Sequence, residues 1–195
     1  MPHYVIADEG VYPIVPIKKI HREHLERQQW ITGDILNFTV PEPILYDLNT
    51  DIDNDLDDSI PGPKILYTSS PIPVMHLSLL DALTAVGVDN LQTYDAVLRD
   101  LDNGIEYKEY KAFNIIGTVA VADMEASTMM GISDSVMTGA NFDKLVLDEE
   151  KCAGKLLFRL AENITAIIVD EAIKTEVEKR GIKGIFFYPS GEWAG

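Results

Sequence analysis

The sequence predicts an α+β fold, in which a few helices pack on a mostly antiparallel sheet. A helical pattern over residues 74–86, a glycine at 87 and a strand pattern to about residue 98 form one helix–glycine–strand unit. Residues 170–180, Gly181 and a strand pattern to residue 188 form a second. Asp102-Asn103-Gly104 between two strand patterns is typical of a tight hairpin, which joins antiparallel strands. Together these observations favour α+β architecture.

The first part of the chain, residues 1–70, is predicted to be a β-rich segment that carries an acidic loop. Apolar pieces within residues 3–17 are broken by Pro13 and Pro16, so strands there are expected to be short or at an edge. Residues 18–30 place Ile20, His24 and Leu25 on one helical face, which predicts a helix. A strand is expected over residues 64–70.

The acidic loop is predicted over residues 41–62, where Asp, Asn and Pro oppose both helix and sheet. This stretch has no Lys or Arg, and its acids are Glu42, Asp47, Asp51, Asp53, Asp55, Asp57 and Asp58. Residues 51–55 imitate the start of a calcium loop, but Leu56 and Gly62 stand where such a loop needs Gly and Glu. This stretch has three possible interpretations: a solvated loop, a patch for a basic partner, or a calcium-responsive module.

The second part, residues 71–195, is predicted to be the main α+β domain. Residues 74–88 have the apolar rows of a buried helix that Gly87 ends, and residues 91–100 form a strand. Residues 105–124 form one long strand or two, bent at Gly117. Short strands follow at 144–150, 156–160 and 165–169. A helix capped by Asp170 and ended by Gly181 then precedes a last strand at 182–189.

The charge balance limits the partners that this protein can have. Against 16 Lys and Arg stand 32 Asp and Glu, a net charge of −16, which repels nucleic acid and anionic membranes and attracts basic partners. Acidity also serves solubility alone. Cys152 is the single cysteine and has no partner for an internal disulfide. With no signal-peptide pattern at the start and no apolar run near the roughly 20 residues that span a bilayer, we predict a cytoplasmic protein.

No motif for catalysis, a cofactor or a metal is recognised in the sequence. Nucleophile-elbow, phosphate-loop and dinucleotide-binding patterns are absent. Glu149 and Glu150 beside Cys152 would raise the pKa of its thiol, which makes a poor nucleophile. His76 is interpreted as a satisfied histidine on an apolar helix. Trp193 is either a partner anchor or a residue that folds back on the domain. We therefore predict no catalytic residue, no metal and no cofactor.

Four stretches of the second part resemble a bacterial polymorphic-toxin immunity family, the one numbered eleven. They are "AFNIIGTVAVADMEAS" at 112–127, "LVLDEEK" at 145–151, "LFRL" at 157–160 and "IIVDEAIKTEVEKRGIKGIFF" at 167–187. The resemblance covers about residues 70–190 and rests on structural motifs. It implies an immunity protein, without catalytic residues, that binds and neutralises a cognate secreted toxin by contact.

The charge predicts the nature of that toxin. A basic effector domain, such as a nuclease with a positive substrate channel, would attract this protein. The predicted contact residues are Asp47, Asp51, Asp53, Asp55, Asp57 and Asp58. Two alternatives belong to other classes: an enzyme with dispersed catalytic residues, and a general acidic interaction module that responds to calcium.

Overall fold

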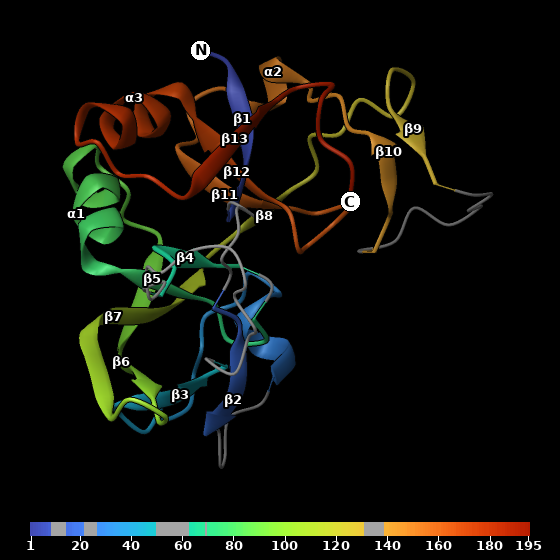
Figure 1. Ribbon diagram of the computed structural model, residues 1–195. Coiled ribbons are helices and arrows are strands. Elements are labelled where there is room, and N and C mark those ends of the chain that lie inside the picture. The colour runs from blue at the N-terminus through green and yellow to red at the C-terminus, as the bar shows by residue number, and fades with distance from the viewer. Residues whose placement is uncertain (9–14, 22–26, 50–62, 69, 131–138) are drawn as a thin grey trace, which may run out of the picture.

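Two β-sheets, built largely from antiparallel neighbours, form the body of the protein, and two helices lie side by side along one flank (Figure 1). The computed structural model describes residues 1–8, 15–21, 27–49, 63–68, 70–130 and 139–195. The predicted α+β class is confirmed. The structure divides the described strands between these two sheets and a small two-stranded sheet, where the sequence predicted a single sheet.

The six-stranded sheet has the order β2-β3-β6-β7-β5-β4. Its centre is a long hairpin whose register runs from Leu91 opposite Ile115 to Asp100 opposite Ile105, and this confirms the predicted turn at residues 102–104. Only the β3–β6 pair is parallel. The strands are β2 (Ile17–His21), β3 (Ile44–Leu48), β4 (Leu66–Tyr67), β5 (Val74–His76), β6 (Leu91–Asp100) and β7 (Ile105–Ile115).

The five-stranded sheet has the order β13-β1-β12-β11-β8, so the first strand of the chain pairs with two strands near its end. Gly117, with φ of 105°, turns the chain from β7 in one sheet into β8 in the other. The predicted bend at Gly117 is therefore confirmed. The strands are β1 (His3–Asp8), β8 (Thr118–Val119), β11 (Leu157–Leu160), β12 (Ile167–Asp170) and β13 (Ile185–Pro189).

The helices have recognisable caps. Helix α3 (Glu171–Lys179) begins after Asp170, whose side chain accepts a hydrogen bond from the Ala172 amide at 2.8 Å, as predicted. Helix α1 (Leu77–Ala85) begins three residues later than predicted because Val74–His76 forms β5. Gly87, with φ of 95°, lies just beyond its end. The remaining helical turns are η1 (Arg27–Trp30) and α2 (Glu149–Cys152).

Three apolar clusters stabilise this arrangement. The first packs against strands of the six-stranded sheet and includes Trp30 and Tyr46. The second joins both sheets to α1 and α3, with Phe113, Leu157 and Ile173 among its members. The third packs against the five-stranded sheet and includes Phe142, which belongs to the small two-stranded sheet of β9 (Thr128–Met129) and β10 (Phe142–Lys144).

Three predicted elements are corrected. The expected helix at 18–30 is strand β2 at its start, because residues 17–21 pair with β3. The expected loop at 41–62 contains strand β3, whose apolar side chains enter the first cluster. The expected strand at 144–150 ends as α2, because the Asp148 side chain accepts hydrogen bonds from the amides of Glu150 and Lys151. Strands from residues 1–70 enter both sheets, and the domain division at residue 70 stays a prediction.

Candidate functional site

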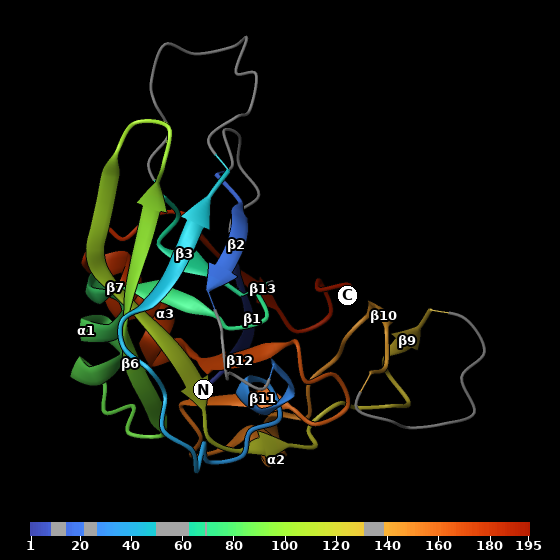
Figure 2. The same ribbon diagram turned by 90° about the horizontal axis from the view of Figure 1, so that it is seen from below.

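The predicted contact residues begin where β3 ends. Asp51, Asp53, Asp55, Asp57 and Asp58 lie outside the described residues, so their predicted role stays a prediction. Asp47, on β3, is described and is only 6% exposed. Because β3 runs parallel to β6, with Asp47 opposite Arg99, the chain leaves β3 at the same end of the sheet as the tip of the β6–β7 hairpin (Figure 2).

Asp47 is held by two basic side chains. Its Oδ1 accepts a hydrogen bond from Arg99 Nε at 2.8 Å, and its Oδ2 lies 2.7 Å from His21 Nε2. Arg99 Nη2 lies 2.9 Å from the same His21 nitrogen, so only one of the two histidine contacts is a hydrogen bond in a given tautomer. Burial alone would raise the pKa of Asp47, but the hydrogen bonds from His21 and Arg99 lower it overall.

This geometry gives Asp47 a structural task. A buried carboxylate that joins β2, β3 and β6 stabilises the end of the sheet from which the acidic segment departs. The sequence could not separate this aspartate from its neighbours, since all of them occur in one acid-rich stretch. The available signal is the mostly apolar stretch "ILYDL" around it, which is typical of a buried strand.

The tip of the β6–β7 hairpin, at the same end of the sheet as the end of β3, exposes apolar side chains. Leu101 is 62% exposed and Ile105 is 40% exposed, on either side of the turn. Asp102 and Glu106 are exposed next to them, and Glu106 pairs with Lys108 at 3.1 Å. Exposed apolar side chains next to charged ones are suited to contact with a partner. The turn was predicted from the sequence and these two side chains were not, although an apolar residue on each side of the turn was the available signal.

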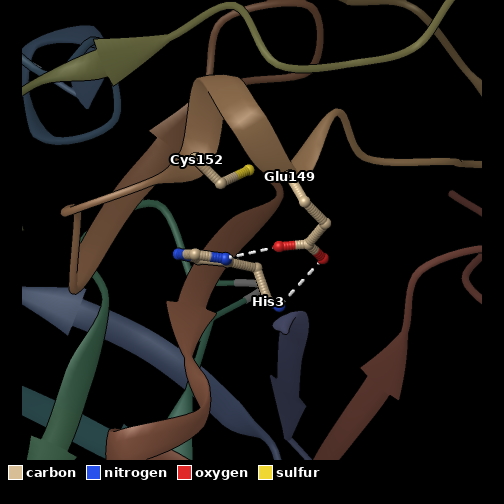
Figure 3. A group of neighbouring side chains, drawn as sticks. All are labelled: His3, Glu149 and Cys152. Atoms are coloured by element: carbon tan, nitrogen blue, oxygen red, sulfur yellow. Dashed lines mark hydrogen bonds and ion pairs between the residues drawn. The ribbon is translucent and has the colours of Figure 1, made fainter. Parts of the chain in front are cut away.

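A second cluster joins the two ends of the chain (Figure 3). His3 on β1 lies with its Nδ1 2.9 Å from Glu149 Oε2, and its amide donates to Glu149 Oε1 at 3.1 Å. Cys152, one helical turn beyond Glu149, is fully buried beside them. Burial and the negative charges of Glu149 and Asp148 raise the pKa of the Cys152 thiol to about 12. The raised pKa was expected from the sequence, although Asp148 stands in the place predicted for Glu150, and a thiol of this kind is a poor nucleophile.

Other candidates are structural where the chain is described. His76 caps α1 by accepting from the Ser78 amide at 3.1 Å, and its ring meets Tyr110 edge-on. Trp193 packs against the third apolar cluster. A groove of about 400 Å³ lies between the end of α1 and the start of β11, and Asp89, Asn90 and Lys155 contribute its polar side chains. Asn90 is engaged there, because its amide donates to the carbonyls of Ile116 and Leu157.

The fold brings exposed apolar and acidic side chains together at one end of the six-stranded sheet. The family model described as an immunity protein family, Imm11, matches residues 54–192, and the chain belongs to that family. A role in immunity against a toxin follows in general terms. The match confirms the resemblance seen in the sequence and begins earlier than residue 70, within the acidic stretch.

No curated protein matches the chain. In the part of the chain that the structure describes, no helix has the length and apolar character needed to cross a membrane.

Proposed function

We propose that this protein binds the effector domain of a cognate basic toxin and blocks it by occupying its surface, without chemistry of its own. The observation that carries the proposal is membership of an immunity family together with a net charge of −16. A toxin with a positive substrate channel, as a nuclease has, is the partner that this charge fits. Family membership supports the inhibitory role, and the charge supports the nature of the partner.

The proposed contact surface is the end of the six-stranded sheet. Leu101 and Ile105 supply apolar contact area at the hairpin tip, while Asp102 and Glu106 supply negative charge around it. The acidic segment that follows β3 departs from the same end of the sheet, because β3 and β6 are parallel there. An apolar centre with a charged rim is the usual anatomy of a protein interface. The ladder of ten-residue β6 against β7 holds the tip in place before binding, which reduces the entropy lost on association.

The proposal is tested with the toxin encoded beside this protein. We expect a complex whose affinity falls as salt rises, since steering between opposite charges is screened within about 10 Å at 0.1 M salt. A variant with Asp51, Asp53, Asp55, Asp57 and Asp58 changed to Asn should associate more slowly. The matched control changes five exposed acids elsewhere, namely Asp81, Glu125, Asp143, Glu150 and Glu192.

Both variants change the net charge from −16 to −11, so any difference between them reports position and not total charge. We expect the loop variant to lose at least about tenfold in association rate, as is typical where local charge steers encounter. Leu101→Ser with Ile105→Ser should mainly increase the dissociation rate, because apolar anchors act after encounter. Equal effects of the two charge variants would refute the loop as the contact, and no binding to the neighbouring toxin would refute the proposed function.

A further inference from the structure

The cluster of His3, Glu149 and Cys152 brings together three side chains that ligate metals. Their ligand atoms all lie within 4.8 Å of one another. They come from the first strand of the chain and from α2, almost 150 residues later. In Figure 3 the imidazole, the carboxylate and the sulfur all point toward one small region between the strand and the helix.

The buried ring of His3 is surrounded by hydrogen-bond acceptors. Its ring is 2% exposed, and both of its nitrogens face hydrogen-bond acceptors: Glu149 on Nδ1, and the Lys155 carbonyl at 3.0 Å on Nε2. Asp170 Oδ2 lies 3.7 Å from Nε2 as well. With Nε2–H donating to the Lys155 carbonyl, the lone pair of Nδ1 faces the Glu149 carboxylate and is open to a cation, either a proton or a metal ion. A metal-bound histidine has this second shell, in which the other N–H donates to a carbonyl or carboxylate.

The local charge is also suited to a cation. Among the described residues, neither Glu149 nor Asp170 has an ion pair with a Lys or Arg. Lys151, the basic residue nearest in sequence within α2, pairs with Asp148 at 2.9 Å. Two carboxylates and a thiol therefore surround a single histidine.

We propose that His3 Nδ1, Glu149 and Cys152 bind a zinc ion, with water as the fourth ligand. Nitrogen, thiolate and carboxylate together are the ligand set that zinc favours over magnesium or calcium, which prefer oxygen alone. On binding, the Cys152 S–H bond breaks, a zinc–sulfur bond forms and the proton leaves to solvent. The Nε2–H of His3 donates to the Lys155 carbonyl.

Only a small adjustment is needed to form such a site. Zinc bonds of about 2.0–2.3 Å place tetrahedral ligand atoms roughly 3.5 Å apart. The 2.9 Å contact of His3 with Glu149 has to open and the cysteine has to approach. Glu149 can move because its side chain is 43% exposed, and this exposure also gives the ion a path from solvent. The bound ion would join β1 to α2. This inference is independent of toxin binding.

The test uses cobalt as a probe of the sulfur ligand. Untagged full-length protein is titrated with Co²⁺, and we expect one ion per chain with the near-ultraviolet absorption of sulfur-to-cobalt charge transfer. Zinc should displace the cobalt and abolish that band. Cys152→Ser should remove the band, and Glu149→Gln should weaken zinc binding by at least about tenfold. Glu150→Gln, one residue along the same helix, is the matched control and should bind as the wild type does.

The thermal midpoint provides a second measurement. At one zinc concentration, zinc should raise the midpoint of the wild type and of Glu150→Gln by more than that of Glu149→Gln, because the weaker site of Glu149→Gln is less occupied. Glu149 is exposed enough for its variant to fold even if a substitution at buried Cys152 does not. Absence of the charge-transfer band in the wild type, or equal zinc affinity of the wild type and Glu149→Gln, would overturn the proposal.

Discussion

Asp47 shows how one buried carboxylate can stabilise the end of a sheet. Asp47→Asn would keep the size of the side chain and remove its charge, leaving Arg99 Nε and His21 Nε2 without a carboxylate. We expect the free energy of unfolding to fall by about 2 kcal/mol at pH 7, the usual cost of losing charged hydrogen bonds. Urea denaturation measures it. Asp95→Asn, which disrupts an exposed pair with Lys111 on the same sheet, should change it by less than about 1 kcal/mol.

The same aspartate predicts a pH dependence. Its pKa in the folded state is lowered by His21 and Arg99, so its stabilising contribution is present above the unfolded pKa of about 4. It is lost as the pH falls through the lower, folded pKa. The gap in unfolding free energy between the wild type and Asp47→Asn should therefore shrink as the pH falls below about 4. A gap that stays constant down to acid unfolding would mean that the cost arises from packing and not from charge.

The sequence could predict the roles of residues whose partners are close to them in the chain. Asp170 as a helix cap and the turn at residues 102–104 follow from neighbours in the chain, and the structure has both. The partners of Asp47 are 26 and 52 residues away, and the partner of His3 is 146 residues away. No local pattern records such contacts. Only the paired strands bring these side chains together.

At the scale of elements, pairing between strands determined the secondary structure where the local sequence pattern favoured another one. Residues 17–21 have polar residues that also suit a helix, yet they form β2 because β3 offers an adjacent edge. Strand β3 was hidden because acids and prolines around it favour a loop, while four of its five residues are buried. By contrast, the predicted bounds of β6 agree with those in the structure, since its hairpin turn and its partner strand are adjacent in sequence.

Strand β11 carries a buried arginine, and this gives a prediction about its packing. Arg159 is 2% exposed, and burial lowers its pKa to about 10. Its guanidinium donates to the carbonyls of Ile164 at 2.8 Å and Trp30 at 3.5 Å, and it has no carboxylate partner among the described residues. The cost of removing this charge from water is therefore only partly offset.

Arg159→Met replaces the charge and keeps most of the side-chain volume, whereas Arg159→Ala leaves a cavity. We expect the alanine variant to be less stable than the methionine variant by about 2 kcal/mol, in the range for truncated buried side chains. Urea denaturation of both variants beside the wild type measures the difference. If methionine proved as destabilising as alanine, the two carbonyl hydrogen bonds would outweigh the packing of the side chain.

At the scale of the whole molecule, the two sheets share one apolar cluster. The second cluster takes Phe113 from the six-stranded sheet, Leu157 from the five-stranded sheet and Ile173 from α3. The N-terminal strand β1 lies inside the five-stranded sheet, and β3 lies inside the other. Neither sheet can form fully without residues 1–70. We therefore expect the chain to unfold as one cooperative unit.

The two tryptophans allow the first and the third apolar clusters to be followed separately. Trp30 is fully buried in the first cluster, and Trp193 packs against the third. In Trp193→Phe the fluorescence reports the first cluster, and in Trp30→Phe it reports the third. Within each variant, we expect the fluorescence transition in urea to coincide with that of far-ultraviolet circular dichroism.

Comparing the two signals within one variant removes the effect of the substitution on stability, since both signals then refer to the same protein. Coincident transitions in both variants mean that the second cluster, which both sheets share, couples the unfolding of the first cluster to that of the third. A Trp193 transition at lower urea than the loss of secondary structure would show that the third cluster opens by itself. In that case the region around β9 and β10 would be a separate folding unit, and the end of the six-stranded sheet proposed to bind the toxin would remain folded without it.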